Sequence, residues 1–219
     1  MPTYIDTHVH TNESRDCFVE LEEYLIRIRS QDLPIDGFVV TDHGSIAEKD
    51  YRRLSEEYGI LVFPGIEAYT NGGHMIVFGI EKHVWENSSN LDKAYINSRQ
   101  LVSKVTDLGG LVSVCHPFDG PRRFFDLDSL LDCVTIIEEK NGSNVMGADL
   151  LAETYRKKHR IYGIGGSDAH YRDDIGLCLT RFEDRITTYQ DLLEALRSGN
   201  FRAVYLKEAM EERRATRRA

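Results

Sequence analysis

Short apolar runs alternate with longer amphipathic stretches along most of the chain. The apolar runs have the length and the β-branched content of strands, whereas the amphipathic stretches repeat their apolar residues at helical spacing. Strands are expected at 3–10, 35–41, 60–63 (leading into Gly65-Ile66-Glu67), 74–80, 111–115, 134–138 and 161–165. Helices are expected at 19–29, 45–59, 91–108, 127–131, 148–158 and 188–198. The second of these helices is expected to open with a capping box at 45–48.

Strands that alternate with helices predict parallel β-α units and an α/β fold. About seven such units with no Pro- or Ser-rich linker favour one closed or nearly closed barrel, with a doubly wound open sheet as the alternative. We therefore expect a single domain over residues 1–205. Residues 206–219 end in EERRATRRA and are expected to form a charged C-terminal helix or tail.

The formal net charge of −9 argues against a broad electrostatic grip on nucleic acid or anionic lipid. It leaves room for a small anionic substrate held through bound cations. No apolar run approaches the roughly 20 residues of a membrane span. The four cysteines show no C-x-x-C spacing, which is typical of free thiols in a reducing compartment. The expected protein is cytoplasmic, with no membrane partner, no extensive nucleic-acid surface and an oligomeric state that the sequence leaves open.

His8 and His10 lie two residues apart in the first expected strand. Residues i and i+2 of a strand point to the same face, so both imidazoles can face one metal ion. Six of the eight histidines lie at or near a strand edge, and five of these six lie at the C-terminal end of a strand, where β/α barrels carry their chemistry. The exception is His74, at the start of its strand. The six are His8, His10, His43, His74, His116 and His170.

Acidic residues accompany these histidines at matching places. Asp42 precedes His43, Glu67 follows the third strand, and Asp168 repeats the i, i+2 spacing with His170. In a barrel the first and last strands are neighbours, so closure would bring the two pairs together. The cluster exceeds what one ion can use, and mixed N and O ligands suit Zn, Mn or Fe(II), so we expect two or three divalent ions. His83 and His159 are expected to be structural.

Together these motifs resemble the PHP (polymerase and histidinol phosphatase) family. The matching segments are DTHVHT at 6–11, TDH at 41–43, GIE at 65–67, GGH at 72–74, CHP at 115–117 and GSDAH at 166–170. The resemblance implies a distorted (β/α)7 TIM-like barrel, the PHP fold, and a trinuclear metal centre. It also implies a small, stand-alone phosphoesterase.

The resemblance further implies how the ligands divide. His8, His10, Glu67 and Asp168 would hold one ion, and Glu67 would bridge to a second ion at His74 and His116. His43 and His170 would hold a third with an acid from the loop after the first strand, for which Asp16 is the better candidate and Glu13 the alternative. The residues expected to carry catalysis are His8, His10, Glu67, Asp168 and His170.

The predicted reaction is hydrolysis of a phosphomonoester by a metal-activated hydroxide, on a nucleotide, an oligonucleotide end or a sugar phosphate. Arg122 and Arg123 follow His116 closely and are expected to bind the phosphate. One alternative is histidinol-phosphate phosphatase, and another is a non-catalytic metal-binding regulatory module. An amidohydrolase-type enzyme would share the His-x-His start but would normally use a lysine where Glu67 stands.

Overall fold

Nine strands form one sheet in the computed structural model, which describes residues 2–88 and 95–218. The sheet order is β7-β6-β5-β4-β3-β2-β1-β8-β9. The strands are β1 (Thr3–Val9), β2 (Gly37–Val40), β3 (Leu61–Tyr69), β4 (His74–Phe78), β5 (Leu111–Val114), β6 (Ile136–Asn141), β7 (Tyr162–Gly166), β8 (Cys178–Phe182) and β9 (Phe201–Tyr205). The helices are α1 (Leu21–Ser30), α2 (Tyr51–Tyr58), α3 (Lys82–Asn87), α4 (Ser98–Asp107), α5 (Ala148–His159), α6 (Tyr189–Ser198) and α7 (Leu206–Arg218).

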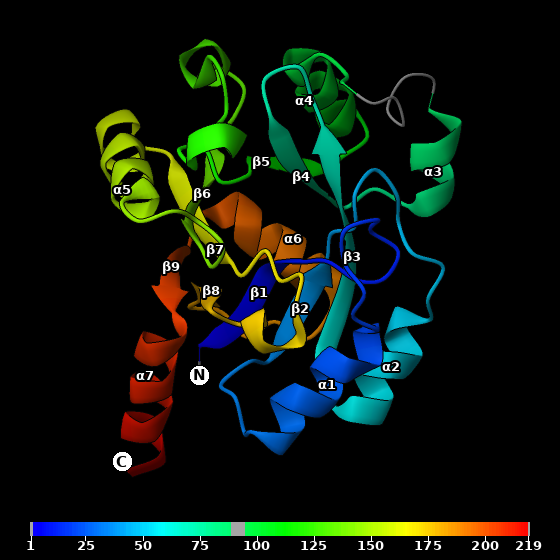
Figure 1. Ribbon diagram of the computed structural model, residues 1–219, viewed down its shortest axis with the longest axis vertical. Coiled ribbons are helices and arrows are strands. Elements are labelled where there is room, and N and C mark those ends of the chain that lie inside the picture. The colour runs from blue at the N-terminus through cyan, green and yellow to red at the C-terminus, as the bar shows by residue number, and fades with distance from the viewer. Residues whose placement is uncertain (1, 89–94, 219) are drawn as a thin grey trace.

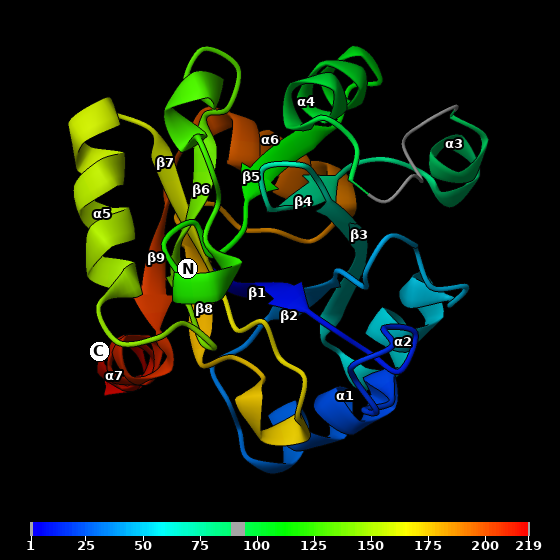
Figure 2. The ribbon, with the colours of Figure 1, turned by 45° about the horizontal axis from the view of Figure 1, so that its top comes forward.

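The sheet curls into a nearly closed barrel, as the sequence predicts. The backbone N–H of His10 donates to the Ala169 carbonyl oxygen at 3.1 Å, and the N–H of Asp168 donates to the His8 carbonyl oxygen at 2.8 Å. These bonds join the end of β1 to the end of β7. The first strand and the seventh therefore meet, as a barrel requires, and Figures 1 and 2 show them side by side.

The strands are not all parallel, which corrects the simple β-α repeat expected from the sequence. The pairs β1–β2, β2–β3, β5–β6 and β6–β7 are parallel, whereas β3–β4, β4–β5, β1–β8 and β8–β9 are antiparallel. Because β4 runs against its neighbours, its first residue lies at the same rim as the last residues of the parallel strands. His74 is the first residue of β4, and the antiparallel direction of this strand places it at the rim with the other histidines.

Apolar side chains fill the barrel beneath that rim. Ile5, Val39, Phe63 and Ile164 belong to one buried cluster that also contains leucines of α6. The remaining strand faces pack outward against α1, α2 and α7 on one side and against α4 and α5 on the other. Figure 1 shows these helices arranged around the strands. The core thus leaves one end of the barrel for polar side chains.

Some expected boundaries shift for tertiary reasons. The capping box at 45–48 is wrong, because α2 begins at Tyr51 with Asp50 as its N-cap. The backbone of Gly44 instead bonds to the Glu67 carbonyl oxygen and to the Trp85 indole, so long-range contacts hold this loop. The helix expected at 91–108 is observed from Ser98 to Asp107, and its residues 91–94 lie outside the described residues.

The last part of the chain adds two strands that the sequence pattern did not predict. β8 and β9 extend the sheet beyond β1, and α7 packs against them. The side chain of Glu212 on α7 accepts hydrogen bonds from the Tyr4 hydroxyl at 2.6 Å and from Arg181 Nε at 2.7 Å. The charged C-terminal segment is therefore a helix attached to the barrel. Across the described residues, no helix has the length and apolar character needed to cross a membrane.

Candidate metal centre

Glu67 lies at the middle of the polar end of the barrel, and its carboxylate is nearly completely buried. One oxygen, Oε1, lies 2.8 Å from His74 Nδ1 and 3.3 Å from His116 Nε2. The other oxygen, Oε2, lies 3.2 Å from His10 Nε2 and 3.0 Å from His43 Nδ1. A single carboxylate on β3 therefore faces histidines from both sides, as the predicted bridging role of Glu67 requires.

Three further side chains, which we call the inner group, meet at the junction of β1 and β7. The inner group consists of His8, His10 and Asp168. The two Nε2 atoms of the histidines lie 3.0 Å apart, and Asp168 Oδ1 lies 3.6 and 3.3 Å from them. Neither imidazole is exposed to solvent. The pairing of His-x-His with Asp-x-His across the closure, expected from the sequence, is what the structure shows.

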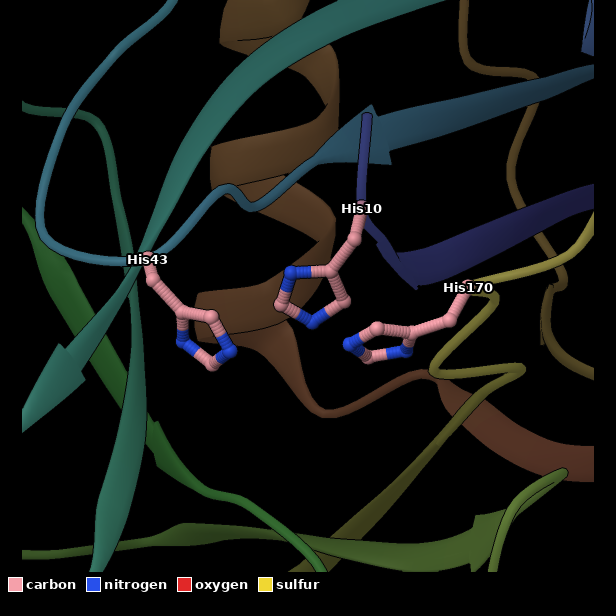
Figure 3. Close-up of side chains that lie close together, drawn as sticks. All are labelled: His10, His43 and His170. Atoms are coloured by element: carbon pink, nitrogen blue, oxygen red, sulfur yellow. The ribbon is translucent and has the colours of Figure 1, made fainter. Parts of the chain in front are cut away.

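A second set, which we call the outer group, lies toward solvent and consists of Asp16, His43 and His170. Asp16 Oδ2 lies 3.3 Å from His43 Nε2 and 3.5 Å from His170 Nε2, and its side chain is 54% exposed. Figure 3 shows His43 and His170 with His10 between them, the three rings gathered from the ends of β1, β2 and β7. Because its carboxylate lies beside both histidines, Asp16 stays the better candidate for this set, with Glu13 as the alternative.

The charges of the cluster depend strongly on one another. Burial by itself would lower the pKa of His8, but the carboxylates of Glu138, Asp168 and Glu67 outweigh burial and raise it well above its ordinary range. The same competition raises the pKa of His10 to about 9. Burial would raise the pKa of Glu67, yet the surrounding histidines hold it well below its usual range. Without metal, the imidazoles of His8 and His10 therefore hold protons at the positions where cations can bind.

The donor set fits divalent metal ions. Four sets of three residues each place their ligand atoms within 4.8 Å of one another, and all but one consist only of imidazole nitrogens and carboxylate oxygens. His43 Nδ1 is buried and has no hydrogen bond of acceptable geometry, although Glu67 Oε2 lies 3.0 Å away. A nitrogen directed at a shared carboxylate without a hydrogen bond is what a cation between ligands requires. All nine predicted ligands belong to this cluster; their role as ligands stays a prediction.

Of the buried polar residues behind the ligands, Ser14 and Glu138 were missed by the sequence reasoning, whereas Asp42 was noted only as a neighbour of His43. The Ser14 hydroxyl lies 3.0 Å from His10 Nδ1 and donates to Asp42 Oδ1 at 2.7 Å. Glu138 Oε1 lies 2.8 Å from His8 Nδ1. Asp42 comes directly after the expected strand at 35–41 and Glu138 ends the expected strand at 134–138, and this position at a strand end is the signal that could have identified them.

The two arginines expected to bind phosphate lie in different places. Arg122 donates from Nη1 to Asp168 Oδ2 and from Nε to Asp119 Oδ2, both at 2.7 Å. Its side chain is 36% exposed. Arg123 instead lies over the Phe125 ring, 5.3 Å from its centroid. The structure thus brings Arg122 to the metal centre and directs Arg123 to a neighbouring surface ring.

Residues 148–201 match the family model described as PHP-associated. The whole barrel resembles the crystal structure of PsfC from Pseudomonas syringae, with a TM-score of 0.73 and 20% identity over 99% of this chain and 98% of that one. It also resembles a two-domain protein of Bacteroides vulgatus that contains a predicted PHP-like metal-dependent phosphoesterase, with a TM-score of 0.67 and 18% identity over 94% of this chain and 65% of that one. A comparison with curated protein sequences gives no match.

A third similar structure corrects one expectation from the sequence. Endonuclease Q, solved in complex with a 27-mer duplex that carries an abasic lesion at the active site, matches with a TM-score of 0.67 and 16% identity over 92% of this chain and 58% of that one. The expectation that this protein has no extensive nucleic-acid surface is therefore wrong. Net charge is a sum over the whole surface and does not describe the rim of one barrel, so it was a weak ground for excluding DNA.

The matched segment at 148–201 includes β7, α5 and α6, and the structural similarity extends over the nearly closed barrel. Each metal-directed motif of the sequence lies at the same end of that barrel. The chain therefore shares the barrel fold of these solved structures, and its residues 148–201 match the PHP-associated family model.

Proposed function

We propose that the protein is a metal-dependent hydrolase of phosphoester bonds, and that its substrate is a phosphomonoester at an accessible end of a nucleotide, an oligonucleotide or a sugar. One observation carries the proposal: the buried carboxylate of Glu67 faces histidines of two different ligand sets at 2.8 to 3.3 Å. A centre with several ions is suited to phosphoryl chemistry, because charge builds on more than one oxygen during the reaction.

Bound divalent ions would supply Lewis acidity toward the phosphoryl oxygens and lower the pKa of a coordinated water. The protein's own part is to hold the ligands in place and to leave one side open. His170 Nδ1 lies 3.0 Å from the Asp168 carbonyl oxygen and can donate to it, which leaves His170 Nε2 free to face Asp16. His8 and His10 are sealed from solvent, so substrate must approach from the outer group.

The exposure of the outer group supports a small terminal phosphate as the reacting group. The side chains of His43, His170 and Asp16 are 12%, 22% and 54% exposed. Arg122 uses Nη1, Nη2 and Nε for protein contacts, and its half-exposed guanidinium keeps further N–H groups that can bind a phosphate oxygen.

A second candidate reaction is hydrolysis of a phosphodiester in DNA. It is favoured by the likeness of the barrel to endonuclease Q in complex with duplex DNA. The chemistry at the metal centre would be the same, and the difference would lie in the leaving group. Histidinol phosphate stays among the phosphomonoesters to be tested.

The test begins with protein purified without chelator, in which bound metals are quantified. The same sample is then assayed, with Mn or Zn added, on nucleoside monophosphates, 5′- and 3′-phosphorylated oligonucleotides, sugar phosphates, histidinol phosphate and an abasic duplex. We expect stoichiometric metal and hydrolysis of at least one phosphomonoester, both lost in Glu67→Gln. Protein that retains its metals and hydrolyses none of these substrates would overturn the proposal and support the regulatory module instead.

A further inference from the structure

Glu138 is a fully buried carboxylate on β6 that contacts two of the predicted ligand residues. Its Oε1 lies 2.8 Å from His8 Nδ1. Its Oε2 accepts the backbone N–H of His116 at 2.8 Å and the Asn141 amide at 2.9 Å. One side chain thus holds the ring of His8, on β1, and the backbone of His116, just after β5.

The two oxygens of Glu138 face different kinds of partner. The His116 N–H is always a donor, and so is Asn141 Nδ2, because Asn141 Oδ1 already accepts the Ser143 N–H at 2.8 Å. Oε2 must therefore act as an acceptor. Oε1 faces a ring nitrogen that either donates or accepts, depending on where the imidazole carries its proton.

The local packing leaves little freedom for the pair. A Cβ atom on Gly166 would lie 2.4 Å from His8 Cβ and 2.8 Å from Glu138 Oε1. Only glycine at this position of β7 lets the His8–Glu138 pair approach the strand so closely. The close fit indicates that the bond between His8 and Glu138 is specified by the fold.

We infer that Glu138 is a positioning residue for the metal centre, which fixes the proton of His8 on Nδ1 so that Nε2 faces the ions. His8 Nε2 points toward His10 Nε2 and toward the carboxylates of Glu67 and Asp168. A neutral imidazole that binds through Nε2 must carry its proton on Nδ1, where Glu138 accepts it. Glu138 also accepts the His116 backbone N–H, and so it connects His8 to the predicted second ligand set of His74 and His116. The inference rests on the proposed metal site, but its test measures zinc affinity and the position of the His8 ring proton, and neither depends on phosphoester hydrolysis.

The substitution Glu138→Gln separates positioning from folding. The amide oxygen of the glutamine must stay with the His116 N–H and Asn141, because both are donors. The amide NH2 group is then presented to His8 Nδ1 and requires a lone pair there. The proton of His8 moves to Nε2, where it blocks metal binding, although every buried group in the apo protein keeps a partner.

The matched control is Glu139→Gln, on the next residue of the same strand. Glu139 is also buried but forms an ion pair with Arg156, away from the ligands. Zinc affinity of both variants and of the wild type is measured by competition with a chromophoric chelator. Unfolding midpoints of the apo proteins serve as the folding check, and proton–nitrogen NMR of the zinc-loaded proteins locates the His8 ring proton.

We expect Glu138→Gln to bind zinc about 10- to 100-fold more weakly than the wild type, as loss of a partner behind a metal ligand typically does. The Nδ1–H signal of His8 should be present in zinc-loaded wild type and Glu139→Gln and absent in Glu138→Gln. Wild-type zinc affinity in folded Glu138→Gln would overturn the inference, whether or not any phosphoester is hydrolysed. If Glu138→Gln does not fold, the NMR spectrum of the zinc-loaded wild type still tests the inference. A His8 ring that binds zinc through Nδ1 would overturn the inference.

Discussion

The inner and outer groups use the same kinds of side chain but are held in different ways. His8, in the inner group, is fully buried, its ring is supported by buried Glu138, and backbone bonds at 2.8 and 3.1 Å lock the junction of β1 and β7 around it. The outer group comes from loops that follow β1, β2 and β7, and its carboxylate is more than half exposed.

The comparison indicates how the proposed metal centre would combine firm binding of ions with access for substrate. Ligands held by buried partners lose little freedom when an ion binds, so the inner group should bind more tightly. Ligands on loops can adjust and can admit substrate, at a cost in affinity. We therefore expect ions at the two groups to differ in affinity, with Glu67 linking them.

The largest effect is expected from Glu67→Gln, because Glu67 alone serves both sides of the cluster. Loss of its charge should remove ions from both groups and reduce phosphoester hydrolysis by more than about 100-fold, beyond what losing a supporting residue costs. Metal content by mass spectrometry and turnover on the same sample measure this. Loss of metal from one group alone would show that Glu67 is not shared.

The next effect separates the two groups directly. Asp16→Asn should lower the bound metal by the outer ion and leave the inner ion in place, because Asp16 contacts only His43 and His170 among the site side chains at the distances given above. Asp168→Asn should weaken the inner ion. Glu13→Gln is the matched control for Asp16 and should behave as wild type. A metal loss in Glu13→Gln with none in Asp16→Asn would reverse the assignment.

The pH dependence should have opposite signs for metal binding and for apo stability. His10, with a pKa raised to about 9, must lose its proton before it binds an ion, so metal affinity should rise with pH until about 9. In the apo protein the protonated His10 stabilises the fold fully below its unfolded pKa of about 6.5, and that contribution is lost as pH rises through about 9. Calorimetric titrations and apo unfolding at several pH values measure the two trends. Metal affinity that is constant from pH 6.5 to 9 would contradict this.

A smaller effect is expected from the arginines. Arg122→Ala should raise KM for a phosphate ester several-fold and weaken the inner ion slightly, because Arg122 binds the outward oxygen of Asp168. Arg123→Ala should leave both unchanged, since Arg123 lies over Phe125. Steady-state kinetics of the two single variants test this, and equal effects would show that the Asp168 contact is not what matters.

Much of the site was predictable because strand ends and ligand types both leave local patterns. The sequence predicted that the pairs His8-x-His10 and Asp168-x-His170 lie close together, because barrel closure follows from the β-α repeat. The reversed direction of β4 was not predicted, although Asn71-Gly72-Gly73 before His74 is a hairpin signal. With that signal the position of His74 would have been expected rather than exceptional.

Other features depend on partners far away in the sequence. The pattern at 45–48 favours a helix locally, but bonds from Gly44 to Glu67 and Trp85 decide otherwise. Glu138 carries no signal beyond its place at a strand end, and its contact with His8 appears only in the folded barrel. Sequence spacing favoured Asp16 and kept Glu13 as the alternative, and the loop path after β1 is what brings the Asp16 carboxylate beside His43 and His170.

The most direct test of the central claim is release of metal from the loaded protein into increasing concentrations of chelator. The account predicts at least two phases, with a weak one from the outer group and a tight one from the inner group. Asp16→Asn should abolish the weak phase and leave the tight phase at the wild-type position. A single phase that Asp16→Asn shifts as a whole, or protein that never holds stoichiometric metal, would contradict the account.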